Sequence, residues 1–114
     1  MSAGDNATGK QADAVFVGEY VIARCRDAGV HAGYLVSTDE RYTVLRESRR
    51  LWYWRGAASL SQVAVYGFDS AKSEGSMIGA PEPLKRLRDS DICELTVCTD
   101  AGRDSIKGMP EWRA

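Results

Sequence analysis

The feature of this chain that most constrains its fold is a series of short β-prone runs separated by polar turns. The runs occupy residues 15–26, 30–38, 42–46 and 51–55, and the first is rich in the Val, Ile, Tyr and Phe side chains that suit a pleated surface. Gly29, in the first turn, can adopt the positive φ that a tight hairpin needs. Short strands joined by tight turns predict a mainly β (α+β) fold, built on a small antiparallel sheet or barrel.

Two short helices complete the predicted fold. The sequence SLSQ, which begins at Ser59, matches a capping box and predicts a helix over residues 60–66, with Gly67 as its stop. Thr99 can cap a second short helix over residues 100–107. Helices of about two turns are stable only when they are docked, so both are expected to lie against the sheet.

The segments between and after these helices give weaker signals. Residues 68–83 are predicted to form a loop, apart from a brief edge strand at residues 77–78. Residues 84–88 are too basic to assign to an element. Residues 92–99 alternate between two faces and predict a strand, and Trp112 is expected to fasten the C-terminal segment to the domain.

Length and composition predict one domain. The 114 residues, of which 44% are apolar, suit a single core, with a disordered N-terminal arm at residues 1–14 and a single β-rich domain at residues 15–114. No apolar run approaches the roughly 20 residues of a membrane span, and the first residues lack a signal-peptide pattern. We therefore expect a cytoplasmic protein without membrane contact. Three cysteines without CxxC spacing indicate reduced thiols.

Catalytic and metal-binding patterns are missing from the sequence. It has one histidine, His31, and neither a nucleophile elbow, a P-loop nor a GxGxxG motif. One histidine and three separated cysteines do not readily supply the three or four ligands of a zinc site. We therefore expect no enzymatic activity, no cofactor and no metal.

The densest group of large side chains lies in SRRLWYWRGAASLSQ, residues 48–62. In a strand, Trp52 and Trp54 point to one side and Tyr53 to the other. Residues 41–55 also hold five arginines against one glutamate, which makes a focused positive field. Aromatic rings beside guanidinium groups suit a purine that carries a phosphate. Core tryptophans with a solvated arginine rim would give the same pattern, and so would an interface between copies of the chain.

Three segments resemble a family of small phage and prophage proteins. They are EYVIARCRDAGVHAGYLVS, RRLWYWRGAASLSQVAVYG and ELTVCTDAGRDSIKGMPEW, and the family is that of the Thoeris anti-defence protein of the first type. The resemblance implies a sponge that sequesters glycocyclic ADP-ribose, and in some members cyclic di- or trinucleotides, without cleaving the signal. It also implies a cytoplasmic homo-oligomer, dimer-based and often hexameric, with ligand pockets between subunits.

The family pattern matches this chain in three places: an arginine in the first strand, the RRLWYW block, and a small-residue turn before a helix. His31 stands where the pattern has an aromatic residue. The predicted ligand-binding residues are therefore Arg24, His31, Arg49, Arg50, Trp52, Trp54 and Ser59.

Two other classes of function stay open. One is a phage structural or protein-interaction module with no nucleotide ligand. The other is a single-stranded nucleic-acid binder on an OB- or SH3-like barrel. The formal net charge of −1 argues against binding of long nucleic acid, because such binders usually carry a basic excess.

Overall fold

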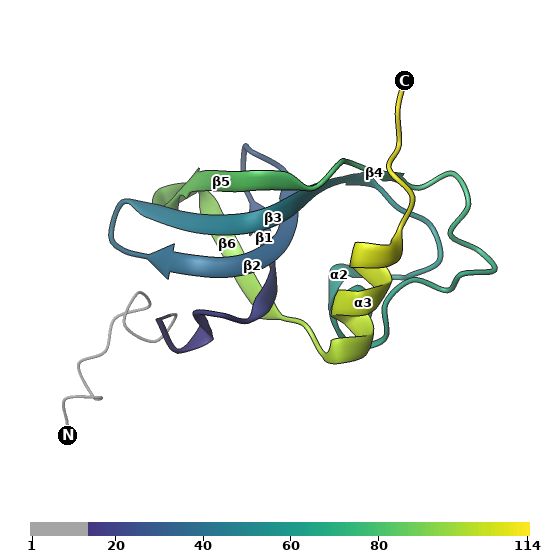
Figure 1. Ribbon diagram of the computed structural model, residues 1–114, viewed down its shortest axis with the longest axis horizontal. Coiled ribbons are helices and arrows are strands. Elements are labelled where there is room, and N and C mark those ends of the chain that lie inside the picture. The colour runs from purple at the N-terminus through teal and green to yellow at the C-terminus, as the bar shows by residue number, and fades with distance from the viewer. Residues whose placement is uncertain (1–13) are drawn as a thin grey trace.

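The computed structural model describes residues 14–114, and the predicted N-terminal arm lies outside the described residues except for Ala14. The described residues form a mostly antiparallel β structure with two α-helices, so the predicted mainly β (α+β) class is confirmed. In Figure 1 most of the sheet lies at one end and the helices with β4 lie at the other. The elements are η2 (Ala14–Phe16), β1 (Tyr20–Cys25), β2 (Val30–Thr38), β3 (Tyr42–Tyr53), α2 (Leu60–Tyr66), β4 (Met77–Ile78), β5 (Glu82–Arg88), η3 (Asp89–Asp91), β6 (Ile92–Val97) and α3 (Asp100–Gly108).

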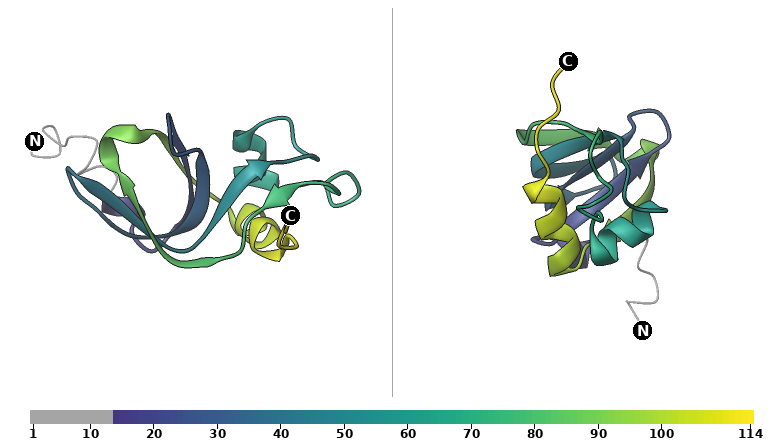
Figure 2. Two further views of the ribbon diagram at one scale, coloured as in Figure 1. Left: turned by 90° about the horizontal axis from the view of Figure 1, so that it is seen from above. Right: turned by 90° about the vertical axis from the view of Figure 1, so that its right-hand side faces the viewer.

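The six strands belong to one sheet in the order β4-β3-β2-β1-β6, and β5 pairs with the first part of β3. All the pairings are antiparallel. Within residues 14–114 no ladder joins β5 to β6, so the sheet is open rather than a closed barrel. Figure 2 shows how strongly the strands curl.

The long strand β3 corrects the prediction of two separate strands at residues 42–46 and 51–55. The polar residues between them continue the strand because β2 and β5 pair with it from both sides. A bulge accommodates Glu47, which has a φ of 52°. Gly33 lies opposite, where an added Cβ would come 2.9 Å from the Arg46 carbonyl oxygen. Glycine therefore permits the bulge on the neighbouring strand.

Other element boundaries follow the predictions in part. The first strand begins at Tyr20 rather than at residue 15, and the unassigned residues 84–88 belong to β5. The two predicted helices are confirmed as α2 and α3, and each is capped by its predicted residue, Ser59 or Thr99. Neither helix, nor any other in residues 14–114, has the length and apolar character needed to cross a membrane.

Two clusters of buried apolar side chains lie on opposite faces of the sheet. The first includes Ile22, Leu51 and Ile106 and lies between the sheet and the helices. The second includes Val21 and Leu45, and strands β1, β2, β3, β5 and β6 all contribute to it. Because β5 and β6 contact the same cluster without pairing, the sheet must curl around it. Each fully buried aliphatic side chain contributes about 1.5–3 kcal/mol.

Helix α3 packs closely against α2 at Gly102. A Cβ on this residue would come 2.1 Å from the Ala64 carbonyl oxygen, so a side chain here would force the helices apart. The backbone N–H of Thr99 donates to the same oxygen (2.9 Å). The Ser105 hydroxyl accepts from the Phe68 N–H (2.9 Å), which anchors the loop after α2 to α3. Both helices and the start of this loop are therefore held together by short-range contacts.

A single carboxylate ties the β1–β2 turn to the link between β5 and β6. Asp91, in η3, accepts from the backbone N–H groups of Asp27 and Ala28 with its two oxygens, each at 2.9 Å. These hydrogen bonds lower the pKa of the Asp91 carboxyl. The two hydrogen bonds of Asp91 thus connect the β1–β2 turn to the segment between β5 and β6, two strands that no ladder joins within residues 14–114.

Candidate functional site

Three of the predicted ligand-binding residues line one shallow hollow, which we name the Arg50 hollow. Its volume is about 450 Å³. The β1–β2 turn forms one side and the end of β3 forms the other. The lining residues are Gly29, Val30, Arg50, Leu51, Trp52 and Trp54.

Arg50, Leu51 and Trp52 are consecutive residues of β3, and its pairing with β4 is irregular between Leu51 and Tyr53, so residues from both sides of the strand end line the hollow. Trp54 lies just beyond the strand, is half-buried and packs against the first core cluster. Trp52 is 59% exposed. The hollow therefore combines one ring fixed by the core, one ring open to solvent and one half-buried guanidinium.

Arg50 has no carboxylate partner among residues 14–114. Its cross-strand neighbour is His31. Burial, together with the positive charge of Arg50, lowers the pKa of the His31 imidazole. An unpaired guanidinium beside a neutral imidazole leaves the positive charge available for an anion.

His31 lies beneath this hollow and does not line it, which corrects its prediction as a ligand contact. The side chain is fully buried, and its Nε2 is 2.8 Å from the Ala28 carbonyl oxygen. Because a backbone carbonyl oxygen can only accept a hydrogen bond, His31 Nε2 is the donor. His31 therefore holds the β1–β2 turn that forms one side of the hollow.

Arg49 is a structural residue, which corrects its prediction as a phosphate contact. Its side chain is 3% exposed. Nε donates to the Gly79 carbonyl oxygen at 2.7 Å. Nη1 donates to the carbonyl oxygens of Ile106 (2.8 Å) and Met109 (2.7 Å). The guanidinium thus joins β3, the segment after β4 and the end of α3, and it has no surface to offer a ligand.

Arg24 and Ser59 lie outside the Arg50 hollow. Arg24 is the cross-strand neighbour of Val30, which lines the hollow, and its Nε lies 3.4 Å from a carboxylate oxygen of Glu94. Ser59 uses its hydroxyl to accept from the Gln62 N–H (3.1 Å). Helix α2 has seven residues and its first turn is capped internally, so Ser59 has a structural function.

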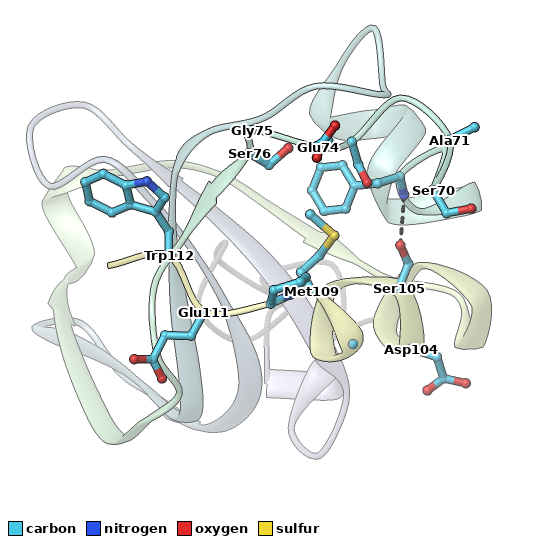
Figure 3. Close-up of a pocket in the computed structure, with 14 residues that line it drawn as sticks. Ser70, Ala71, Glu74, Gly75, Ser76, Asp104, Ser105, Met109, Glu111 and Trp112 are labelled. Atoms are coloured by element: carbon cyan, nitrogen blue, oxygen red, sulfur yellow. Dashed lines mark hydrogen bonds between the residues drawn. The ribbon is translucent and has the colours of Figure 1, made fainter. Parts of the chain in front are cut away.

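A larger hollow was not predicted from the sequence. We name it the tail hollow because it lies between the loop at residues 68–76 and the C-terminal tail at residues 108–112 (Figure 3). Its volume is about 780 Å³. The sequence signals that pointed toward it were a long loop and an isolated Trp112. Besides these two segments, Asp104 and Ser105 of α3 line it.

The two hollows share a wall formed by Trp52 and Trp112. Trp52 lines the Arg50 hollow, Trp112 lines the tail hollow, and their ring centroids are 5.9 Å apart with an interplanar angle of 51°. The backbone N–H of Trp112 donates to the Ile78 carbonyl oxygen at 2.9 Å. The tail is therefore held beside β4, and the expectation that Trp112 fastens it is consistent with this contact.

The described residues contain no group of three or more His, Cys, Asp or Glu side chains placed to hold a metal ion. All three cysteines are free, and Cys25 and Cys98 are buried whereas Cys93 is exposed. Burial raises the pKa of both the Cys25 and the Cys98 thiol to about 11. These two thiols are therefore protonated at neutral pH and behave as apolar core residues.

A family model described as Domain of unknown function (DUF6948) matches residues 18–106, so the chain belongs to that family. The matched span contains every residue that lines the Arg50 hollow, whereas part of the tail hollow lies beyond it. Comparison with curated proteins and with solved structures finds no match.

Proposed function

We propose that this DUF6948 domain binds a small anion with a flat ring, of the cyclic-nucleotide class, in the Arg50 hollow and sequesters it without cleaving it. The observation that carries the proposal is the grouping of Trp52, Trp54 and an unpaired Arg50 around one hollow of about 450 Å³. A ring can stack on the exposed face of Trp52, which is worth roughly 1–3 kcal/mol for a base. The Arg50 guanidinium can then contact a phosphate with two parallel hydrogen bonds.

Arg24 supplies a second positive charge near the hollow. It lies across from Val30, and its pair with Glu94 is about half-exposed on both sides. Such surface pairs contribute little to stability, so Arg24 can turn from Glu94 to a ligand at small cost. A ligand with two phosphates would therefore meet two guanidinium groups, which supports a dinucleotide-like anion.

The ligand class and the sequestering activity rest on the resemblance to the phage sponge family. The expected ligands are glycocyclic ADP-ribose and cyclic di- or trinucleotides, and their removal in the host cytoplasm would block an anti-phage defence. The lining of the hollow supports binding without turnover, because none of its six residues carries a nucleophile, a carboxylate or an imidazole.

Calorimetric titration with cyclic ADP-ribose isomers and with cyclic di- and trinucleotides tests the proposal. At least one ligand should bind and be recovered chemically intact. Arg50→Gln should weaken binding by about tenfold or more, because a charge-assisted contact is lost. Arg88→Gln, an exposed arginine near the opposite end of β3, is the matched control and should bind like the parent. Absence of heat with every ligand contradicts binding, and a chemically altered ligand indicates an enzyme.

A second candidate is self-association or another protein interface, and a specific observation favours it. Trp52 and Tyr53 are both at least half-exposed at the end of β3, and Tyr66 is exposed at the end of α2. Exposed aromatic side chains are enriched at protein interfaces. Native mass spectrometry separates the candidates: a dimer-based or hexameric assembly that retains a small molecule supports both, whereas an assembly without nucleotide affinity supports an interaction module.

A further inference from the structure

The tail hollow has a negative lining, in contrast to the Arg50 hollow. None of its fourteen lining residues is a lysine or an arginine, although the chain has fifteen of these residues. Three carboxylates line it instead, those of Glu74, Asp104 and Glu111. No lining residue offers a positive charge to a phosphate, so the phosphate-bearing ligand proposed above does not suit this hollow.

One of the three carboxylates has no ion pair among residues 14–114. Asp104 pairs with Arg103 at 2.8 Å, and Glu111 pairs with Arg113. Figure 3 shows both carboxylates directed away from Met109, whereas Glu74 lies on the loop side with Gly75 and Ser76. No lysine or arginine of the described residues pairs with Glu74. The charge of Glu74 is thus left for another cation.

The remaining walls of the tail hollow combine apolar and aromatic side chains with the hydroxyl groups of four serines. Phe68 is buried, Met109 is half-buried, and Trp112 is 38% exposed. An aromatic face attracts a cation through its quadrupole, and a thioether adapts to the shape of an apolar group. Arg55 lies beside Gly75 on the loop, but it neither lines the hollow nor pairs with Glu74 among residues 14–114. A hollow with aromatic walls and a carboxylate without an ion pair therefore favours a ligand that is positively charged and partly apolar.

We propose that the tail hollow is a second ligand site, which takes an organic cation: an ammonium or guanidinium group on an apolar body. The cationic head pairs with Glu74, and the apolar body packs against Phe68 and Met109. This site is independent of the anion proposed for the Arg50 hollow, although the Trp52–Trp112 wall brings the two ligands close together.

Three probes of the same shape and different charge test the inference: benzylamine, benzyl alcohol and benzoate. Each is titrated into the ¹⁵N-labelled full chain, and amide shifts are followed by NMR. Benzylamine should shift the signals of residues 68–76 and 108–112 and should bind more tightly than benzyl alcohol. Benzoate should leave these signals unchanged. Added salt should weaken the binding of benzylamine and not that of benzyl alcohol.

Matched variants identify the carboxylate. Glu74→Gln should weaken benzylamine binding by about two- to fivefold and leave benzyl alcohol unaffected, because one exposed ion pair and no apolar contact is lost. Asp104→Asn, whose carboxylate is already paired, should change benzylamine binding by less than about twofold. Benzoate binding as tightly as benzylamine, no benzylamine shift at tens of millimolar, or an unchanged affinity in Glu74→Gln would each overturn the inference. Because no nucleotide is used, such a result leaves the proposed function untouched.

Discussion

The Arg50 hollow and the tail hollow touch at the contact between Trp52 and Trp112, but they are built in different ways. Neighbouring residues at the end of β3, within positions 50–54, form one wall of the Arg50 hollow, so the composition of this wall follows from the local sequence. The tail hollow lies between a loop and a tail more than thirty residues away, and Arg49 joins the segment after β4, at Gly79, to the tail at Met109. Two neighbouring hollows in one small domain can thus have different origins: the Arg50 hollow depends mainly on local structure, and the tail hollow on long-range contacts.

The charges of the two hollows differ as well. Among residues 14–114, a guanidinium without an ion pair lines the Arg50 hollow, and a carboxylate without one lines the tail hollow. The two proposed ligands, of opposite charge, would therefore lie on the two sides of one tryptophan pair. Substitutions that act on one hollow alone, or on the wall between them, can therefore test whether the two hollows differ in this way.

The largest expected effect comes from Arg49→Leu, which removes the connection between β3 and the tail. The carbonyl oxygens of Gly79 and Met109 would lose the donor that Arg49 supplies, and that of Ile106 would keep only the Met109 N–H, so at about 1–3 kcal/mol for each unsatisfied oxygen the free energy of unfolding should fall by about 3 kcal/mol. Urea unfolding measures this loss. Arg50→Leu is the control and should change stability by less than about 1 kcal/mol. Equal losses in the two variants would contradict the structural function assigned to Arg49.

A smaller loss of stability is expected from Gly102→Ala, which would displace the helix that carries part of the tail hollow. The added Cβ would clash with the Ala64 carbonyl oxygen at 2.1 Å and push α3 away from α2, which should lower stability by roughly 1–3 kcal/mol. Gly108→Ala adds the same methyl group to the same helix where nothing lies within 4 Å, so it should be close to neutral. Thermal unfolding compares the two. Benzylamine binding should also weaken in Gly102→Ala, and equal losses of stability in the two variants would disprove the close approach of α3 to α2.

Trp52→Ala removes the part of the shared wall that faces the Arg50 hollow, and it tests the binding site proposed there. Trp52→Ala should reduce the affinity for whichever cyclic nucleotide binds by about 1–3 kcal/mol, because a stacked ring is lost. Stability should change little, since Trp52 is largely exposed. Calorimetry gives the affinity, and Tyr53→Ala, on the other side of the strand, is the control. Parent-like affinity in Trp52→Ala would remove this ring from the site.

The smallest expected effect is a pH dependence that belongs to the Arg50 hollow. Burial lowers the pKa of His31 below its usual value of 6.5, so the folded state resists protonation more than the unfolded state does. The stability contribution is complete above pH 6.5 and is lost as the pH falls toward the folded pKa, with a slope of at most about 1.4 kcal/mol per pH unit. Urea unfolding between pH 7 and pH 5 should show this slope in the parent and a flatter one in His31→Gln. Identical slopes would exclude His31 as the cause.

The elements that could be predicted from the sequence are those set by local chemistry. The cap residues Ser59 and Thr99 begin α2 and α3, and the turns around β2 define its ends. Strand β3 was split in the prediction, because residues 47–50 are polar and form a strand only through pairing with β2 and β5. A pattern search along the chain cannot show such pairing.

The candidate site follows the same division. Strand alternation predicted the grouping of Trp52 and Trp54, and Arg50 shares their spacing. Arg49 was predicted to contact the ligand because it belongs to the RRLWYW block of the family pattern, and His31 because it stands where that pattern has an aromatic residue. Arg49 is buried through carbonyl oxygens at least 30 residues away along the chain, and His31 because a turn folds over its strand. The sequence around Arg49 and His31 does not show which carbonyl oxygens will accept their hydrogen bonds.

The Asp91 contact with the β1–β2 turn has a consequence for how the chain reaches this structure. Its two hydrogen bonds join residues 63 and 64 positions apart in the sequence, and they require every strand between them to be in place. Contacts with such separation close large loops and form slowly compared with hairpins and helices. The Asp91 contact is therefore expected to form late, and because β6 also packs on the second cluster, the inner face of the sheet can be covered only after residues 92–97 have been synthesised.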